Sequence, residues 1–161
     1  MTHTMMIPGR GTYHLAHLVL DVNGTVAGGG HLIDGVRERL LSLRQSGWEV
    51  HWITADTRGR QVMLDVEMGW PAVRIQAAES GSEASQKADF VHELGAEHVV
   101  AVGNGSNDVA MLRKAAVGIA VLGPEGLAVD ALLAADAVVP NIHAALDLLE
   151  DPDRLVATLR R

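Results

Sequence analysis

The sequence lacks cysteine and contains few aromatic side chains. None of its 161 residues is a cysteine, which excludes disulfides, thiolate metal sites and cysteine nucleophiles. Aromatic residues make up only 3% of the chain, while alanine, valine, leucine and glycine are frequent. Small and aliphatic residues in these proportions favour a parallel sheet covered by helices. The absence of cysteine suits a reducing compartment, and we expect a cytoplasmic protein.

Basic clusters and long uninterrupted apolar runs are also missing. The net charge is −7, from 20 acidic and 13 basic residues, and no basic block exists beyond the terminal Arg160–Arg161. We therefore expect neither a nucleic acid nor an anionic membrane as a partner. The longest apolar stretch, residues 115–140, is interrupted by glycines, a proline and acids, so it fails as a membrane span. The first residues also lack the pattern of a secretory signal.

Segments of strand length alternate with segments of helix length along most of the chain. We predict strands at 17–22, 48–54, 72–77, 98–103, 117–123 and 136–140. Helices are predicted at 34–47, 58–69, 82–95, 106–115 and 125–135, followed by one or two closing helices. Asp34 and Ser82 are predicted N-caps. This alternation predicts an α/β fold, a Rossmann-like three-layer α/β/α sandwich with a mainly parallel sheet.

The length predicts one domain spanning residues 1–161. Residues 1–15 contain two short apolar pieces around Pro8-Gly9-Arg10-Gly11, and we expect a small hairpin or an edge strand there. Only eight residues separate Thr25 from Asp34, which is too few for an inserted domain. The end of the sheet beyond Asp21 should therefore be open, or covered by loops or a neighbouring subunit.

Polar residues follow three of the predicted strands at the points where those strands end. Asp21 ends the first strand and Thr54 ends the second, while Asn104, Asn107 and Asp108 follow the fourth. Lys87 lies in the helix that precedes the fourth strand. Open α/β sheets bind ligands beyond the carboxyl ends of their strands, so these groups should converge.

Four motifs, in their order along the chain, resemble those of the haloacid dehalogenase (HAD) superfamily of phosphoryl-transfer enzymes. They are DVNGT at 21–25, Thr54 in TADT, Lys87, and GNGSND at 103–108. The resemblance runs from about residue 15 to residue 140 and is strongest to the phosphorylation domain of P-type ATPases and its small soluble relatives. It implies a HAD-like fold without a cap domain, a small phosphorylated substrate and possible homo-oligomerisation.

The resemblance also implies roles for individual residues. Asp21 would be the nucleophile that forms an aspartyl-phosphate, with Asn23, Thr54 and Lys87 as the other catalytic positions. The groups expected to bind phosphate are Gly24, Thr54, Ala55, Lys87 and Asn107. The cofactor implied is Mg²⁺, with Asp21, Asn23 (through its main-chain carbonyl), Asn104 and Asp108 as the expected metal site.

Asn23 and Asn104 depart from the usual pattern of family phosphatases, which have aspartate at both positions. An amide at position 23 cannot shuttle a proton, which removes a contribution of about 10²–10⁴-fold. An amide at position 104 brings no charge to a metal. These departures leave two alternatives, a weakened phosphohydrolase that prefers activated phosphates, or a catalytically silent regulatory domain that binds phosphate or nucleotide. A receiver-like phosphoacceptor is disfavoured because no acidic pair precedes Asp21.

Histidines are numerous, with eight in the chain, and raise the question of a further metal site. His14 and His17 are three residues apart in or beside predicted strands. Because side chains alternate between the faces of a strand, this spacing places the two imidazoles on opposite faces. We therefore do not expect His14 and His17 to form a paired ligand site.

Overall fold

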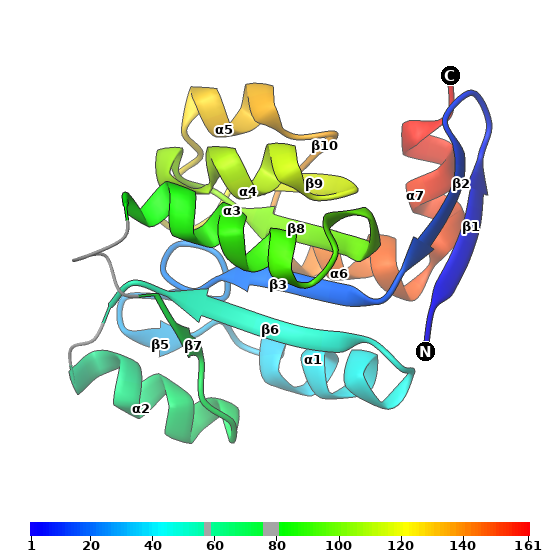
Figure 1. Ribbon diagram of the computed structural model, residues 1–161. Coiled ribbons are helices and arrows are strands. Elements are labelled where there is room, and N and C mark those ends of the chain that lie inside the picture. The colour runs from blue at the N-terminus through cyan, green and yellow to red at the C-terminus, as the bar shows by residue number, and fades with distance from the viewer. Residues whose placement is uncertain (57–58, 76–80) are drawn as a thin grey trace.

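The fold is built on a six-stranded parallel sheet, seen in the computed structural model, which describes residues 1–56, 59–75 and 81–161 (Figure 1). The strands are β3 (His17–Asp21), β6 (Glu49–Thr54), β7 (Val73–Arg74), β8 (Val99–Gly103), β9 (Val117–Val121) and β10 (Ala137–Val139). Their order is β10-β9-β8-β3-β6-β7, and every neighbouring pair is parallel. The neighbouring strands β8 and β9 are buried throughout, as their continuous apolar sequences predict.

Helices cover both faces of this sheet, and each face has its own hydrophobic cluster. One cluster contains buried residues of α1 (Val36–Gln45), α2 (Gly59–Met68), α6 (Ile142–Glu150) and α7 (Pro152–Leu159). The other contains buried residues of α3 (Glu83–Glu93), α4 (Val109–Lys114) and α5 (Val129–Ala134). Two short 3₁₀ turns, η1 (Ala96–His98) and η2 (Ser106–Asp108), flank β8. The predicted three-layer α/β/α sandwich is confirmed.

Residues 3–15 form a hairpin beside α7 rather than an additional strand of the central sheet (Figure 1). The antiparallel strands β1 (His3–Ile7) and β2 (Gly11–Leu15) pair only with each other. Met5, Ile7 and Leu15 are buried in the larger hydrophobic cluster. The Arg161 amide donates to the Pro8 carbonyl at 2.9 Å, so the C-terminal end of the chain meets the hairpin turn.

Two local predictions were wrong. Asp34 does not cap α1, because the preceding chain turns through Gly35, which has a left-handed φ of 79° and occupies the N-cap position. The helix predicted at 125–135 begins only at Val129, because a turn closed by Gly126 N–H and the Gly123 carbonyl occupies its first residues. Ser82 caps α3 as predicted, accepting a hydrogen bond from the Ser85 amide.

The other predicted boundaries of helices and strands differ less from the observed ones. Residues 25–34 hold a minimal hairpin of β4 (Ala27–Gly28) and β5 (His31–Leu32), and the chain closes with two helices. Arg58 of the helix predicted at 58–69, and residues 76–77 of the strand predicted at 72–77, lie outside the described residues. Among the described residues, no helix combines the length and the apolar character needed to cross a membrane.

Candidate active site

A polar cavity lies beyond the carboxyl ends of β3, β6 and β8. These three strands are neighbours in the sheet, so the residues that end them meet at one edge. The cavity has a volume of about 550 Å³. Its lining residues are Asp21, Asn23, Thr54, Ala55, Asp56, Glu83, Asn104, Gly105, Asn107 and Glu125. Most of the predicted site residues therefore converge on one cavity.

A buried lysine joins two acids at this edge of the sheet. Lys87 Nζ donates to Asp21 Oδ1 at 2.7 Å and to Asp108 Oδ1 at 2.8 Å. The Lys87 side chain is fully buried, and Glu83 Oε1 lies 3.3 Å from its ammonium. Glu83 and Lys87 are four residues apart on α3, a spacing that places them on the same helix face. Residues distant in the sequence thus form one ion-pair network.

Asp108 is enclosed by hydrogen bonds on both of its oxygens. Oδ1 accepts from Lys87, and Oδ2 accepts from the main-chain amides of Asn104 and Gly105, each at 2.9 Å. The carboxylate is fully buried and does not line the cavity. Asp108, expected from the resemblance as a metal ligand, is placed in this structure to hold Lys87 and the loop after β8.

The pKa values of this network reflect burial and mutual charge. Burial and the negative charge of Asp108 raise the pKa of Asp21 to about 7, although the Lys87 ammonium acts in the opposite direction. The two aspartates raise the pKa of Lys87 above its usual value despite its burial. With Asp21 ionised, three carboxylates surround one ammonium within 3.3 Å, which leaves an excess of negative charge.

Thr25 connects the two positions expected to meet a metal. Its hydroxyl lies 3.5 Å from Asp21 Oδ2 and 3.2 Å from Asn104 Oδ1. A hydroxyl carries one proton and cannot satisfy both acceptors fully. Hard oxygen donors that lack full partners, beside a net negative cluster, suit Mg²⁺. The residues present fit the implied ion, with oxygens of Asp21, Asn23 and Asn104, which all line the cavity, as the donors.

The turn after β3 brings main chain close to this oxygen-rich region. Gly24 has a φ of 82°, which favours glycine, and a Cβ there would lie 2.6 Å from Asn104 Nδ2. The same Cβ would lie 2.8 Å from Glu125 Oε2. Gly24 therefore leaves room for the amide of Asn104 and the carboxylate of Glu125, which approach the turn together.

The remaining predicted residues line the cavity in different ways. Thr54 is 2% exposed, and its hydroxyl accepts a hydrogen bond from the Asp56 amide at 3.0 Å. Ala55 lies between them on the cavity wall. Asn107 donates through Nδ2 to Glu83 Oε1 at 2.8 Å, so its amide is held against α3. Thr57, the last residue of the TADT motif, is outside the described residues.

Sequence reasoning did not assign a role to several residues in or beside the cavity. Thr25 belongs to the DVNGT motif, but nothing in the sequence indicates that its hydroxyl bridges Asp21 and Asn104. The i,i+4 spacing to Lys87 could have identified Glu83. Glu125 comes from the loop after β9, and no sequence pattern indicated its role, because only tertiary structure brings that loop to Gly24.

No family model matches this chain, but curated proteins do. The uncharacterized protein MJ0073 of Methanocaldococcus jannaschii is 39% identical over 92 residues, which cover 55% of this chain and 99% of that protein. The phospholipid-transporting ATPase tat-1 of Caenorhabditis elegans is 37% identical over 70 residues, covering 44% of this chain and 6% of the ATPase. The second match agrees with the resemblance to P-type ATPases, in a short segment.

Solved structures match over nearly the whole chain. A Legionella pneumophila protein assigned to subfamily III A of the HAD superfamily hydrolases has a TM-score of 0.67 and 16% identity, covering 90% of this chain and 87% of its own. The 3-deoxy-D-manno-octulosonate 8-phosphate phosphatase of Moraxella catarrhalis, solved with magnesium, phosphate and KDO, has a TM-score of 0.62 and 19% identity, covering 91% and 94%. The chain therefore has the fold of the HAD superfamily, and its described residues form it without a cap domain. Within that fold it belongs to one family with MJ0073.

Proposed function

We propose that this protein is a Mg²⁺-dependent phosphohydrolase that acts through an aspartyl-phosphate on Asp21. The observation that carries the proposal is the placement of Asp21 at the base of a polar cavity, paired with the buried Lys87 that Asp108 holds in turn. The cavity is polar and open enough for a small phosphorylated molecule. The matching folds of known phosphatases support the same reading.

The chain's own groups account for the first half of the reaction. A carboxylate oxygen of Asp21 attacks phosphorus, the bond to the leaving oxygen breaks, and its electron pair departs with the leaving group. Lys87 holds Asp21 in position and offsets negative charge at the reacting carboxylate. Thr54, Ala55 and Asn107 line the cavity, and we expect them to contact phosphoryl oxygens through a hydroxyl, a main-chain amide and a side-chain amide respectively.

Asn23 determines which substrates fit this site. Its amide cannot give a proton to the leaving oxygen, nor accept one from the water that later attacks the aspartyl-phosphate. Leaving groups that depart as stable anions do not need that proton. We therefore infer a preference for acyl phosphates or phosphoric anhydrides over alkyl phosphate esters, and slow hydrolysis of the phosphoenzyme.

When bound, Mg²⁺ would neutralise negative charge on the phosphoryl group. Asp21, the Asn23 carbonyl and Asn104 Oδ1 would hold it. Asn104 brings no charge to that set, but the exposed Glu125 approaches the Gly24 turn at the same point as Asn104. Glu125 has neither a hydrogen bond nor an ion pair among the described residues. We infer that Glu125 restores the negative charge that the family's second acid provides elsewhere.

Phosphate release with Mg²⁺ tests the proposal. Acetyl phosphate and p-nitrophenyl phosphate should be hydrolysed, glycerol phosphate much more slowly, and Asp21→Asn should abolish all three rates. If wild type and Asp21→Asn release phosphate equally, Asp21 is not the nucleophile. Homo-oligomerisation and a cytoplasmic location remain predictions, the first measurable by light scattering.

The alternative is a silent domain that binds phosphate or nucleotide without turnover. The two amides, Asn23 and Asn104, favour it, because they stand where proton transfer and metal charge are expected. Calorimetry with ATP and Mg²⁺ would then show binding, while mass spectrometry after incubation with acetyl phosphate would find Asp21 unmodified. A phosphorylated Asp21 peptide would decide for the enzyme.

A further inference from the structure

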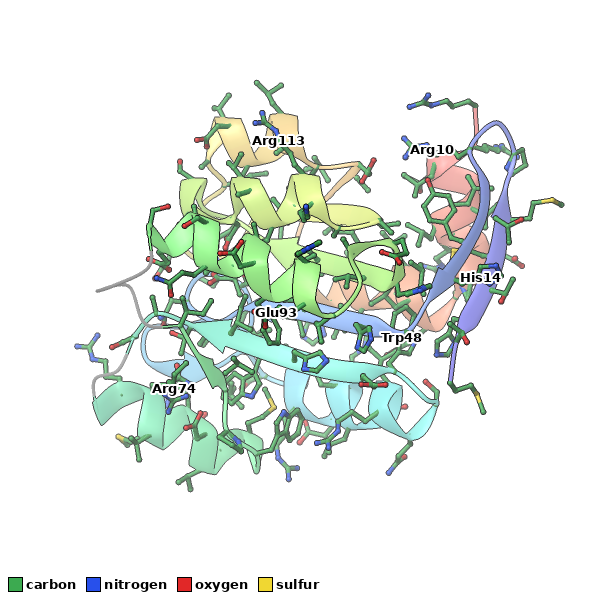
Figure 2. The ribbon with its side chains drawn as sticks, viewed as in Figure 1. Arg10, His14, Trp48, Arg74, Glu93 and Arg113 are labelled. Carbon is green, nitrogen blue, oxygen red and sulfur yellow. The ribbon has the colours of Figure 1, made fainter. Side chains whose placement is uncertain are left out.

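A second group of ligand-type side chains lies at the opposite end of the sheet. His17 begins β3 and Asp21 ends it, so His17 is about 13 Å from the cavity along a five-residue strand. The parallel register pairs His17 with Glu49, the first residue of β6. Trp48, labelled in Figure 2, directly precedes β6 and identifies this end of the sheet.

The side chains of His17, Glu49 and His51 point toward a common centre. Glu49 and His51 are two apart on β6, so strand alternation places both on the same face as their partner. His17 Nδ1 lies 3.4 Å from His51 Nε2 and 3.5 Å from Glu49 Oε2. One ligand atom from each residue can be chosen so that all three lie within 4.8 Å of one another.

These separations can be compared with those of a metal centre. Zinc binds imidazole nitrogen and carboxylate oxygen at about 2.0–2.2 Å, so two ligands at a tetrahedral angle are about 3.3–3.5 Å apart. The distances from His17 to its two neighbours have these values before any ion is added. Only the Glu49 carboxylate would need to close toward His51, and that side chain is 59% exposed.

We propose that His17, Glu49 and His51 form a binding site for a divalent transition ion, Zn²⁺ foremost, with an open position for water. Two imidazoles and a carboxylate select such ions over Mg²⁺. The site is therefore separate in place and in chemistry from the cavity beyond Asp21, and it does not depend on the proposed phosphohydrolase activity.

The surroundings are compatible with metal binding. Burial and the neighbouring His17 lower the pKa of His51, so its imidazole is neutral and can offer a lone pair at neutral pH. Phe90 of α3 packs edge-on against the His51 ring, with centroids 5.5 Å apart, and restricts its orientation. The positive charge of Arg44 also acts on His51, and Glu49 opposes it. A bound ion would link β3 to β6, the strands that carry Asp21 and Thr54.

The competing explanation is a metal-free pair, a hydrogen bond between the two imidazoles with Glu49 as a counter-ion. Chelator-treated protein titrated with Zn²⁺ by calorimetry, without Mg²⁺ or phosphate, separates the two. We expect one site, weakened at least tenfold in His17→Gln and in His51→Gln and unchanged in His92→Gln, an exposed histidine of α3. Circular dichroism of the metal-free variants shows whether each still folds.

Co²⁺ provides a second readout, because a four-coordinate site with nitrogen ligands gives intense visible absorption bands, whereas an octahedral oxygen site gives only weak ones. The intense bands should appear in wild type and in Asp21→Asn, and disappear in His51→Gln. The inference is overturned if Zn²⁺ binds wild type and a folded His51→Gln equally, if it binds neither, or if binding is lost in Asp21→Asn instead.

Discussion

Replacement of Lys87 by methionine tests the buried network most directly. The variant keeps most of the volume of the side chain and removes the ammonium that Asp21 and Asp108 contact at 2.7 and 2.8 Å. Lys87 and Asp108 are both fully buried, so little solvent can replace the lost charge. Removing one partner of a buried ion pair costs about 3–5 kcal/mol. A domain's total stability is about 5–15 kcal/mol, so the variant should remain folded but weakened.

The cost should also depend on pH. Without Lys87 the pKa of Asp21 rises further above its value of about 7, so Asp21 takes up a proton as the pH falls and relieves the repulsion with Asp108. Urea unfolding at pH 8 and pH 5.5, with chelator present, should therefore show the larger loss at pH 8.

Lys114→Met is the matched control, because Lys114 is the chain's other lysine and is exposed at the end of α4. It should change stability by less than about 0.5 kcal/mol. Adding Asp108→Asn to Lys87→Met should recover part of the loss. A loss below about 1 kcal/mol at pH 8, or one that grows as the pH falls, would refute the network's role.

Three further outcomes are expected. Asp21 binds its proton more tightly in the folded state, at a pKa of about 7 against the ordinary 3.8, so its ionisation destabilises the fold. The contribution of Asp21 to the free energy of unfolding therefore falls between about pH 4 and pH 7, by up to about 1.4 kcal/mol per pH unit. Urea titrations of Asp21→Asn at these pH values should lack this slope. Asn23→Asp should raise turnover of glycerol phosphate by about 10²–10⁴-fold and that of acetyl phosphate much less, and equal gains would contradict the proton-transfer argument. Glu125→Gln should weaken Mg²⁺ binding about tenfold by calorimetry, as expected for a unit charge about 5 Å from the ion in water, and Asn104→Asp should reverse the loss. No change in Glu125→Gln would exclude its charge from the metal site.

The order of strands and helices could be predicted from the sequence because it depends on local periodicity. A continuous apolar run such as residues 98–103 indicates a strand buried on both faces, and glycine or a capping serine indicates where a helix ends or begins. Asp21 and Thr54 could be placed at one edge because parallel strands bring their carboxyl ends together. Boundaries were less accurate where turn hydrogen bonds compete with the helix, as they do between Glu125 and Val129.

The sequence by itself determined the layers, the strand ends and the kinds of residue found there. Tertiary structure alone decided how those residues act on one another. It surrounded Asp108 with three donors, brought Glu125 to the Gly24 turn, and set His17 beside His51 through the register of β3 and β6. The physical reason is the sequence separation involved. Hydrophobic periodicity is a property of one continuous segment, whereas distances between side chains depend on how segments far apart in the sequence pack together.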